Sequence, residues 1–276
     1  MDNKKAFEQP GVYSDTVAEL SKKLIEANNK LKESERQRTE MIENISHDLR
    51  APLTAIRSTI DYCIQKTADG VDPLTEDEAG AMLKVLDSRV KTLEVLVKDL
   101  YLLTCIDSGR EEFRFRNIPL AQFLEEYFYA AEIDDKYTDY NLVMDIPDNM
   151  EASVSVDVSK ISRVLDNLFT NACKYSDKGS RITLGAGIEN ERTFFYVEDN
   201  GWGIPEDSVP HVFDRTYKVS NARTPNEDTS SGLGLAITKS IVMQHGGEIK
   251  CDSKLGKGSR FTVFLTRIDD LDETDE

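Results

Sequence analysis

Forty consecutive residues without glycine or proline constrain this chain more than any other feature. They lie between Gly11 and Pro52, and apolar residues recur through them alternately three and four positions apart. That spacing is the a/d stripe of a coiled coil and predicts one helix over about residues 14–68. Pro52 removes one helical hydrogen bond and predicts a kink there. The stripe, broken at two polar positions, comprises Val17, Leu20, Leu24, Ala27, Leu31, Ser34, Arg38, Met41 and Ile45.

A second helix is predicted after a cluster of helix breakers at residues 68–73. Thr75 and Glu78 form a capping-box signature, and the helix ends near Ser108. Two amphipathic helices joined by a short loop make an antiparallel hairpin, which buries little apolar surface by itself. A homodimeric four-helix bundle, with two long helices from each chain, is the predicted solution. The apolar face of the second helix comprises Met82, Leu83, Leu86, Val90, Leu93, Leu96, Val97 and Leu100.

From residue 113 onward, short strand-like and helix-like segments alternate. Helices are predicted at 120–133, 158–175 and 233–245, and strands at 113–117, 140–146, 181–188, 193–198, 247–253 and 259–266. Segregated elements of this kind predict an α/β sandwich with a mixed sheet, so the fold class of the chain is α+β. Four regions are expected: a coiled-coil helix at 1–40, a helical hairpin at 41–110, an α/β domain at 111–268 and an acidic, disordered tail at 269–276.

Charge and composition narrow the classes of function. The chain of 276 residues has a net charge of −17, with 16 basic and 20 acidic residues in residues 1–110 and 18 and 31 in residues 111–276. Such an acidic surface argues against nucleic acid as a partner and against docking on an anionic membrane. No apolar run approaches the roughly 18–20 residues of a membrane span, and no signal peptide opens the chain. We therefore expect a cytoplasmic chain, or the soluble part of a larger protein, with four reduced cysteines.

His47 is the first candidate for chemistry. It lies two residues after Ile45, about 200° around a helical wheel from the apolar stripe, so it is predicted to project away from the core. A solvated surface histidine is one interpretation. The other is a nucleophile, because a neutral imidazole nitrogen is nucleophilic near neutral pH and Asp48 beside it can orient the ring and accept its proton.

A second candidate group lies on the predicted helix 158–175. Asn167, Asn171 and Lys174 are spaced four and then three residues apart and therefore share one face. The Asn171 oxygen suits Mg²⁺, Lys174 can reach a phosphate, and Tyr175 can lie beside a base. The alternative is an ordinary amphipathic helix whose polar side faces water.

Two glycine-containing segments follow. Asp199, Gly201 and Gly203 come directly after a predicted strand, where a carboxylate can accept a hydrogen bond from an adenine amino group and glycine permits close backbone approach. Residues 231–235, Ser-Gly-Leu-Gly-Leu, open a predicted helix whose N–H groups can bind phosphate. Neither segment is a Walker A or Rossmann motif, and each alone is also compatible with a glycine-rich turn.

Between those segments, Arg215 and Lys218 are candidate phosphate contacts, although solvated surface charges are an equal alternative. Residues 219–231 are polar and aperiodic, which predicts a mobile lid. His211 and His245 are interpreted as structural.

In this order, the motifs resemble those of sensor histidine kinases over about residues 41–266. The matching segments are Ser46–Leu53 as the H box, Asn167–Tyr175 as the N box, Asp199–Pro205 as G1, His211–Lys218 as the F box and Ser231–Leu235 as G2. The resemblance implies a GHKL-type ATP-binding domain in which His47 is the phosphoacceptor and Asp48 activates it. It also implies that Asn171 is the Mg²⁺ ligand and Asp199 reads adenine. The remaining implied nucleotide contacts are Asn167, Lys174, Tyr175, Gly201, Gly203, Arg215, Lys218, Gly232, Leu233 and Gly234.

The resemblance implies an ATP-dependent autokinase that passes its phosphoryl group to an aspartate on the receiver domain of a response regulator. It implies ATP and Mg²⁺ as cofactors, a homodimer, and a possible upstream sensor or membrane component outside this chain, which would make the chain the cytoplasmic portion of a membrane-bound kinase. A non-catalytic ATP-binding scaffold is the alternative.

Three residues refine that expectation. Asn167 stands where related ATP-hydrolysing proteins have a glutamate base, which disfavours a free ATPase. Thr216 stands where the family usually has a second aromatic residue, which leaves the anchoring of the lid open. Ala51, four residues after His47, lacks the polar group that usually positions the water for dephosphorylation of the response regulator, so weak phosphatase activity is predicted.

Overall fold

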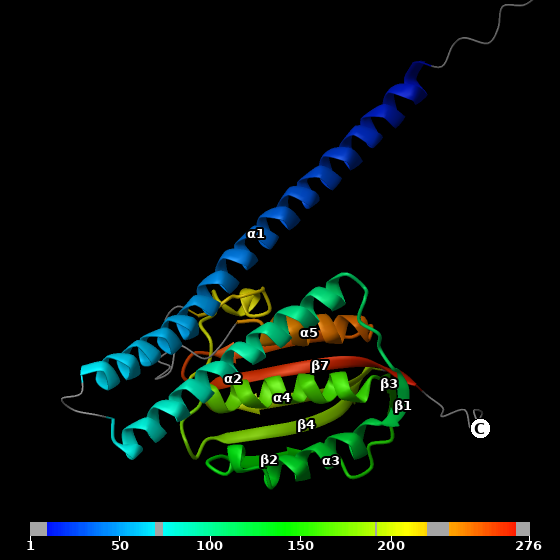
Figure 1. The fold of residues 1–276 in the computed structure, drawn as a ribbon. Helices are drawn as coiled ribbons and strands as arrows, with labels where there is room; N and C mark the ends of the chain where they lie inside the picture. The colour runs from blue at the N-terminus through cyan, green and yellow to red at the C-terminus, as the bar shows by residue number, and fades with distance from the viewer. Residues whose placement is uncertain (1–9, 70–73, 191, 220–231, 269–276) are drawn as a thin grey trace, which may run out of the picture. The chain divides into compact units, whose positions relative to one another are not determined.

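The computed structural model describes residues 10–69, 74–190, 192–219 and 232–268 (Figure 1). Most of the predicted breaker cluster, most of the predicted lid and the whole predicted acidic tail lie outside these residues. The chain divides into two units, residues 1–47 and 48–276. No helix among the described residues is long and apolar enough to cross a membrane.

Helix α1 (Pro10–Asp69) confirms the long helix and extends it by a few residues. It continues through Pro52, whose missing N–H leaves the carbonyl one turn earlier without its helical partner. Ion pairs four residues apart, such as Lys23 with Glu19 at 2.7 Å, lie along its surface. In the first unit, the apolar side chains of Leu20, Leu24 and Leu31 are exposed.

Helix α2 (Glu76–Asp107) begins with the predicted capping box. The Glu78 N–H donates to Thr75 Oγ1 at 3.2 Å, and the Thr75 N–H donates to Glu78 Oε2 at 3.0 Å. Cys63 Sγ and Met82 Sδ lie 3.2 Å apart, which places α1 beside α2 in the hairpin. The N-terminal two thirds of α2 leave apolar side chains exposed, whereas its last turns are buried through Leu96, Asp99, Leu102, Leu103, Cys105 and Ile106.

The C-terminal part of the second unit is, within the described residues, a seven-stranded mixed sheet covered on one face by α3 (Leu120–Glu132), α4 (Val158–Lys174) and α5 (Gly234–Gln244) (Figure 1). The strand order is β1-β3-β7-β5-β4-β2, and β6 pairs with β7. Among the described strands, β2 and β4 pair in parallel and the other pairs are antiparallel. The strands are β1 (Arg116–Pro119), β2 (Asn141–Asp145), β3 (Ser153–Val156), β4 (Arg181–Glu189), β5 (Arg192–Asp199), β6 (Glu248–Lys254) and β7 (Gly258–Ile268).

Two strand predictions need correction. The first strand begins at Arg116 rather than at residue 113, because Phe113 and Phe115 pack edge-on against His245 instead of joining the ladder. Strand β3 was not predicted at all. It is only four residues long, and it forms because Val154 and Val156 are completely buried between the sheet and the helices.

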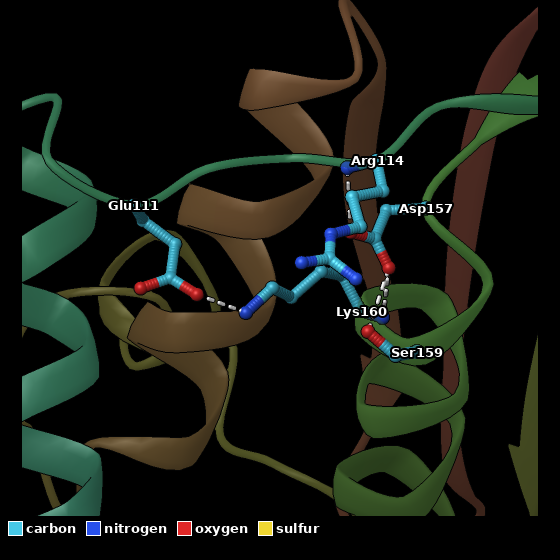
Figure 2. A network of polar contacts seen from close by, with 5 residues as sticks. All are labelled: Glu111, Arg114, Asp157, Ser159 and Lys160. Carbon is cyan, nitrogen blue, oxygen red and sulfur yellow. Dashed lines mark hydrogen bonds and ion pairs between the residues drawn. The ribbon is translucent and has the colours of Figure 1, made fainter.

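The segment that joins α2 to the sheet is held at the start of α4 (Figure 2). Asp157 is the N-cap of α4: its carboxylate accepts hydrogen bonds from the Lys160 N–H at 3.2 Å and from Ser159 Oγ at 2.6 Å. The same carboxylate accepts the Arg114 N–H at 2.9 Å, and Lys160 forms an ion pair with Glu111. The N-cap of α4 therefore also holds the segment that leads from α2 into β1.

Candidate functional site

Helix α4 presents a polar stripe opposite its buried apolar face. Asn167, Asn171 and Lys174 are half-buried on this stripe, as their spacing predicted. The Asn167 amide donates to the Gly234 carbonyl at 3.1 Å and to Thr238 Oγ1 at 3.3 Å. Asn167 thus connects α4 to the start of α5 and brings the second predicted phosphate-binding segment to the first.

Further along the same stripe, two lysines from separate segments lie close together. Burial first, and then the charge of Lys218, lower the pKa of Lys174. A bound polyanion would relieve this repulsion, so the pair marks a position suited to phosphate. Lys174 Nζ also lies 5.2 Å from the centre of the Tyr175 ring, which keeps the ring beside the cation.

The end of β5 presents a buried carboxylate. Asp199 is 6% exposed, and its Oδ1 accepts the Gly201 N–H at 2.8 Å. Burial raises the pKa of Asp199 to about 6, although hydrogen bonds from the backbone N–H groups of Gly201 and Ser259 act in the opposite direction. A buried carboxylate with few donors retains acceptor capacity for a ligand amino group.

The turn after Asp199 is enclosed by backbone. A Cβ on Gly201 would lie 2.3 Å from the Tyr175 carbonyl, and a Cβ on Gly203 would lie 2.1 Å from the Lys254 carbonyl. Gly203 also has a φ of +69°, which side-chain-bearing residues rarely adopt. Both glycines are required by close backbone approach, so their first role is to hold the turn against α4 and the β6–β7 hairpin.

The start of α5 forms the other side of the site. Leu233 precedes the helix and supplies no side-chain cap. N–H groups at the start of a helix are the type of donor that binds an anion. The Leu233 side chain is itself buried. Gly232 has a φ of +63°, and a Cβ there would lie 2.9 Å from the backbone of Thr216.

At position 216, where the second aromatic residue is missing, a backbone hydrogen bond holds the segment. The Thr216 N–H donates to the Gly232 carbonyl at 3.1 Å, which ties the two ends of the predicted lid together. Thr216 is buried and has a φ of +61°, an unfavourable conformation for a β-branched residue. Nearby, Phe213 packs edge-on against Phe261, which anchors this segment on β7.

The two candidate cations of this segment engage carboxylates of the helices. Arg215 pairs with Asp107 at 2.7 Å, and Lys218 Nζ pairs with both oxygens of Asp48 at 2.8 and 2.9 Å. In this conformation, both cations that the sequence predicted as phosphate contacts are therefore paired with carboxylates.

On α1, the His47 side chain is exposed, as its position relative to Ile45 predicted. Ala51 lies one turn later and is also exposed, with only a methyl group to offer water. Of the other histidines, His211 pairs with Asp214 at 2.9 Å. His245 accepts the Asp157 N–H at 3.0 Å through Nε2, while Nδ1 lies 2.8 Å from the Ile241 carbonyl. Burial lowers the pKa of His245, which favours its neutral form.

Three residues near the site were not singled out from the sequence. Thr238 bonds Asn167, Ser259 donates its N–H toward Asp199, and Ser176 is buried beside the turn at Gly201. Their signals are weak, because a lone serine or threonine is common in any element. Ser259 and Thr238 are brought to the site by the pairing of β5 with β7 and of α4 with α5.

The described residues contain no cluster of three His, Cys, Asp or Glu side chains able to hold a metal by themselves. A divalent cation here would need ligand phosphates to complete its coordination, with the Asn171 oxygen as a protein ligand. Within the described residues, the Asn171 side chain has no hydrogen-bond partner, so its oxygen can serve that role.

Comparison with known proteins agrees with this geometry. The model of the His kinase A (phospho-acceptor) domain matches residues 37–109, and that of the histidine kinase-, DNA gyrase B- and HSP90-like ATPase matches residues 156–268. Sensor histidine kinase WalK of Bacillus subtilis is 35% identical over 245 residues, which cover 87% of this chain and 39% of that protein. Sensor protein kinase WalK of Staphylococcus aureus is 33% identical over 84% of this chain and 54% of its own length.

Solved structures show the same fold. The histidine kinase AdeS of Acinetobacter baumannii has a TM-score of 0.60 at 24% identity, over 80% of this chain and 97% of its own. Histidine kinase ThkA in complex with response regulator protein TrrA has a TM-score of 0.63 at 21% identity, over 87% of this chain and 66% of its own. The two matched domains, in this order and with these relatives, place the chain in the sensor histidine kinase family, with a phosphoacceptor domain followed by a GHKL-type ATP-binding domain.

Proposed function

We propose that the chain is an ATP-dependent protein-histidine autokinase of a two-component system. The chain spans 39% of the length of its Bacillus relative, so the activity of the whole protein is part of the proposal. The observation that carries it is that one chain has both features: an exposed His47 followed by Asp48, and a nucleotide site built from α4, β5 and α5. In this scheme, residues 41–110 carry the phosphoacceptor, 111–268 bind ATP, 1–40 relay a signal and 269–276 form an acidic tail.

The chemistry follows from the groups present. One nitrogen of the His47 ring attacks the terminal phosphorus of ATP, the bond to the leaving oxygen breaks, and ADP departs. Asp48 accepts the proton from the other ring nitrogen, which keeps the attacking nitrogen electron-rich. Lys174, Lys218 and Arg215 neutralise the phosphate charge, the start of α5 supplies N–H donors, and Asp199 accepts from the adenine amino group. Mg²⁺ at Asn171 would offset the charge of the phosphates.

Asn167 separates this proposal from simple ATP hydrolysis. An amide cannot remove a proton from water, and this amide is already bonded to Gly234 and Thr238. Asn167 therefore positions the α5 N-terminus rather than activating water. The phosphoryl group is thereby reserved for an acceptor on the protein.

A homodimer is part of the proposal. Along the α1–α2 hairpin, large apolar side chains are exposed in the single chain, which is costly in water unless a second copy covers them. Pairing two hairpins yields the predicted four-helix bundle. The exposed set comprises Leu53, Ile60, Ile64, Leu83, Val90 and Val97.

The partner proposed to receive the phosphoryl group is the receiver domain of a response regulator. Support comes from the ThkA structure, which holds a response regulator, and from the family to which the chain belongs. We also propose that the chain acts in the cytoplasm, alone or as the cytoplasmic portion of a membrane-bound kinase. The net charge of −17 disfavours nucleic acid as a partner.

Incubation with ATP labelled at the γ-phosphate tests the activity. The parent should gain an acid-labile, alkali-stable label, and His47→Gln should lose it while still binding ATP. His211→Gln is the matched control, because His211 is also exposed but lies outside the phosphoacceptor helix. If the parent binds ATP without ever becoming labelled, alone or with activating partners, the chain is the non-catalytic scaffold instead.

A further inference from the structure

The hydroxyl of Ser176 is buried in the nucleotide site without an assigned role. Ser176 follows the C-terminal end of α4 and is 6% exposed. Its Oγ has no partner at hydrogen-bonding geometry within the described residues. A buried hydroxyl is normally satisfied, and one that lacks a partner beside a binding site calls for an explanation in terms of that site.

Backbone packing determines where this hydroxyl points. The Trp202 N–H donates to the Tyr175 carbonyl at 3.0 Å, which draws the turn after β5 onto the end of α4. A Cβ at Gly201 would lie 2.3 Å from Ser176 Oγ and 2.9 Å from Asp199 Oδ1. The hydroxyl and the carboxylate therefore border the same small volume, and Gly201 keeps that volume free of a side chain.

We propose that Ser176 is a positioning residue for Asp199: its hydroxyl donates to the carboxylate, keeps it ionised, and thereby makes it an acceptor for the adenine amino group. The proposal rests on the proposed role of Asp199 in reading the base. The nearby hydroxyl also acts in the expected direction: it lowers the pKa of Asp199 against burial, which raises it, and the resulting pKa is about 6.

The chemical consequence is selectivity for the base. An ionised carboxylate can only accept hydrogen bonds, so it favours the amino group at C6 of adenine. It repels the carbonyl oxygen that hypoxanthine carries at the same position. A protonated Asp199 would instead donate to that carbonyl. Holding the carboxylate ionised therefore favours ATP over inosine triphosphate, which differs from ATP only at this edge of the base.

The other groups around Asp199 do not replace the hydroxyl. Glu198, on the same strand, raises the pKa of Asp199 and is itself paired with Arg260. Cys251 of β6 faces the carboxylate, but its pKa is raised to about 12, chiefly by burial, so it stays a neutral thiol near neutral pH. Ser259 contributes its backbone N–H, which no substitution removes.

The test compares Ser176→Ala with the parent by calorimetric titration of ATP and inosine triphosphate from pH 5 to 8, both in a His47→Gln background to prevent transfer. At pH 6, Ser176→Ala should bind ATP about three- to tenfold more weakly, which matches the net contribution of one ordinary hydrogen bond. The ATP affinities of Ser176→Ala and the parent should converge near pH 8. At pH 6, the preference for ATP over inosine triphosphate should be lower in Ser176→Ala than in the parent. Ser176→Thr, which keeps the hydroxyl, should restore both properties.

Thr193→Val is the matched control, because Thr193 Oγ1 is also buried without a partner but lies at the far end of β5. It should leave the pH profile unchanged. Carboxyl-carbon NMR of Asp199 without nucleotide should show a higher pKa in Ser176→Ala than in the parent. An unchanged Asp199 pKa together with an unchanged ATP preference overturns the proposal. If Asp199→Asn binds ATP as well as the parent, the assignment of Asp199 to adenine fails as well.

Discussion

Removing the carboxylate of Asp157 should weaken the whole second unit, because one side chain caps α4 and also holds the segment leading into the sheet (Figure 2). Loss of an N-cap costs about 1 kcal/mol of unfolding free energy. The bond from the Arg114 N–H adds about 0.5–1.5 kcal/mol. We therefore expect Asp157→Ala to lower the free energy of unfolding by about 2 kcal/mol, equivalent to a fall of roughly 4–8 °C in Tm.

The matched control is Asp134→Ala. Asp134 is also an N-cap and accepts the Lys136 N–H at 3.1 Å, but it caps only the three-residue 3₁₀ helix Asp135–Tyr137 on the surface. Its loss should cost about 0.5 kcal/mol or less. Urea denaturation of both variants measures the difference. If Asp157→Ala loses no more stability than Asp134→Ala, the reasoning that the Asp157 cap holds both α4 and the segment at Arg114 is refuted.

A pH series separates the charge of Asp157 from its capping. Although burial opposes the change, hydrogen bonds from Ser159 and from the N–H groups of Arg114 and Lys160 lower the pKa of Asp157 below 3.8. Its charge therefore contributes stability that is present above about pH 4 and is lost as the pH falls through the folded-state pKa. Asp157→Asn keeps a cap but not the charge, so its deficit against the parent should shrink as the solution is acidified.

Three further predictions concern the nucleotide site and the phosphoacceptor helix. Asp199→Asn should abolish ATP binding yet stabilise the nucleotide-free protein at pH 8 by about 2–3 kcal/mol. Because the carboxyl pKa is raised to about 6, ionisation of Asp199 destabilises the folded protein increasingly from about pH 4 and fully above about pH 6. The gain in Asp199→Asn should therefore vanish near pH 4 in thermal denaturation; a gain independent of pH would contradict this. Thr216→Gly should raise the free energy of unfolding by about 0.5–1 kcal/mol, because glycine accepts the positive φ without strain; a loss in urea denaturation would show that the threonine is not strained. Ala51→Thr should speed the loss of phosphate from a phosphorylated response regulator in the presence of ADP; fast loss with the parent would show that position 51 does not limit this reaction.

Periodic and motif-based features could be read from the sequence alone. The heptad spacing before Pro52 predicted α1, and Thr75 with Glu78 predicted the start of α2, because helix periodicity and caps are encoded within a few neighbouring residues. The stripe of Asn167, Asn171 and Lys174 was predictable for the same reason, since residues three and four apart must share a helical face.

Other features depended on which distant segments pack together. Nothing local marks Ser176, which matters only because the turn at Gly201 closes over it and encloses its hydroxyl with Asp199. Likewise, Asp157 was not singled out from the sequence, and its role follows from the contacts with Arg114 and His245 that the fold creates. Local periodicity therefore determined the elements and the residue types of the site. Tertiary packing decided their partners, burial and ionisation, because these depend on atoms brought together from positions far apart in the chain.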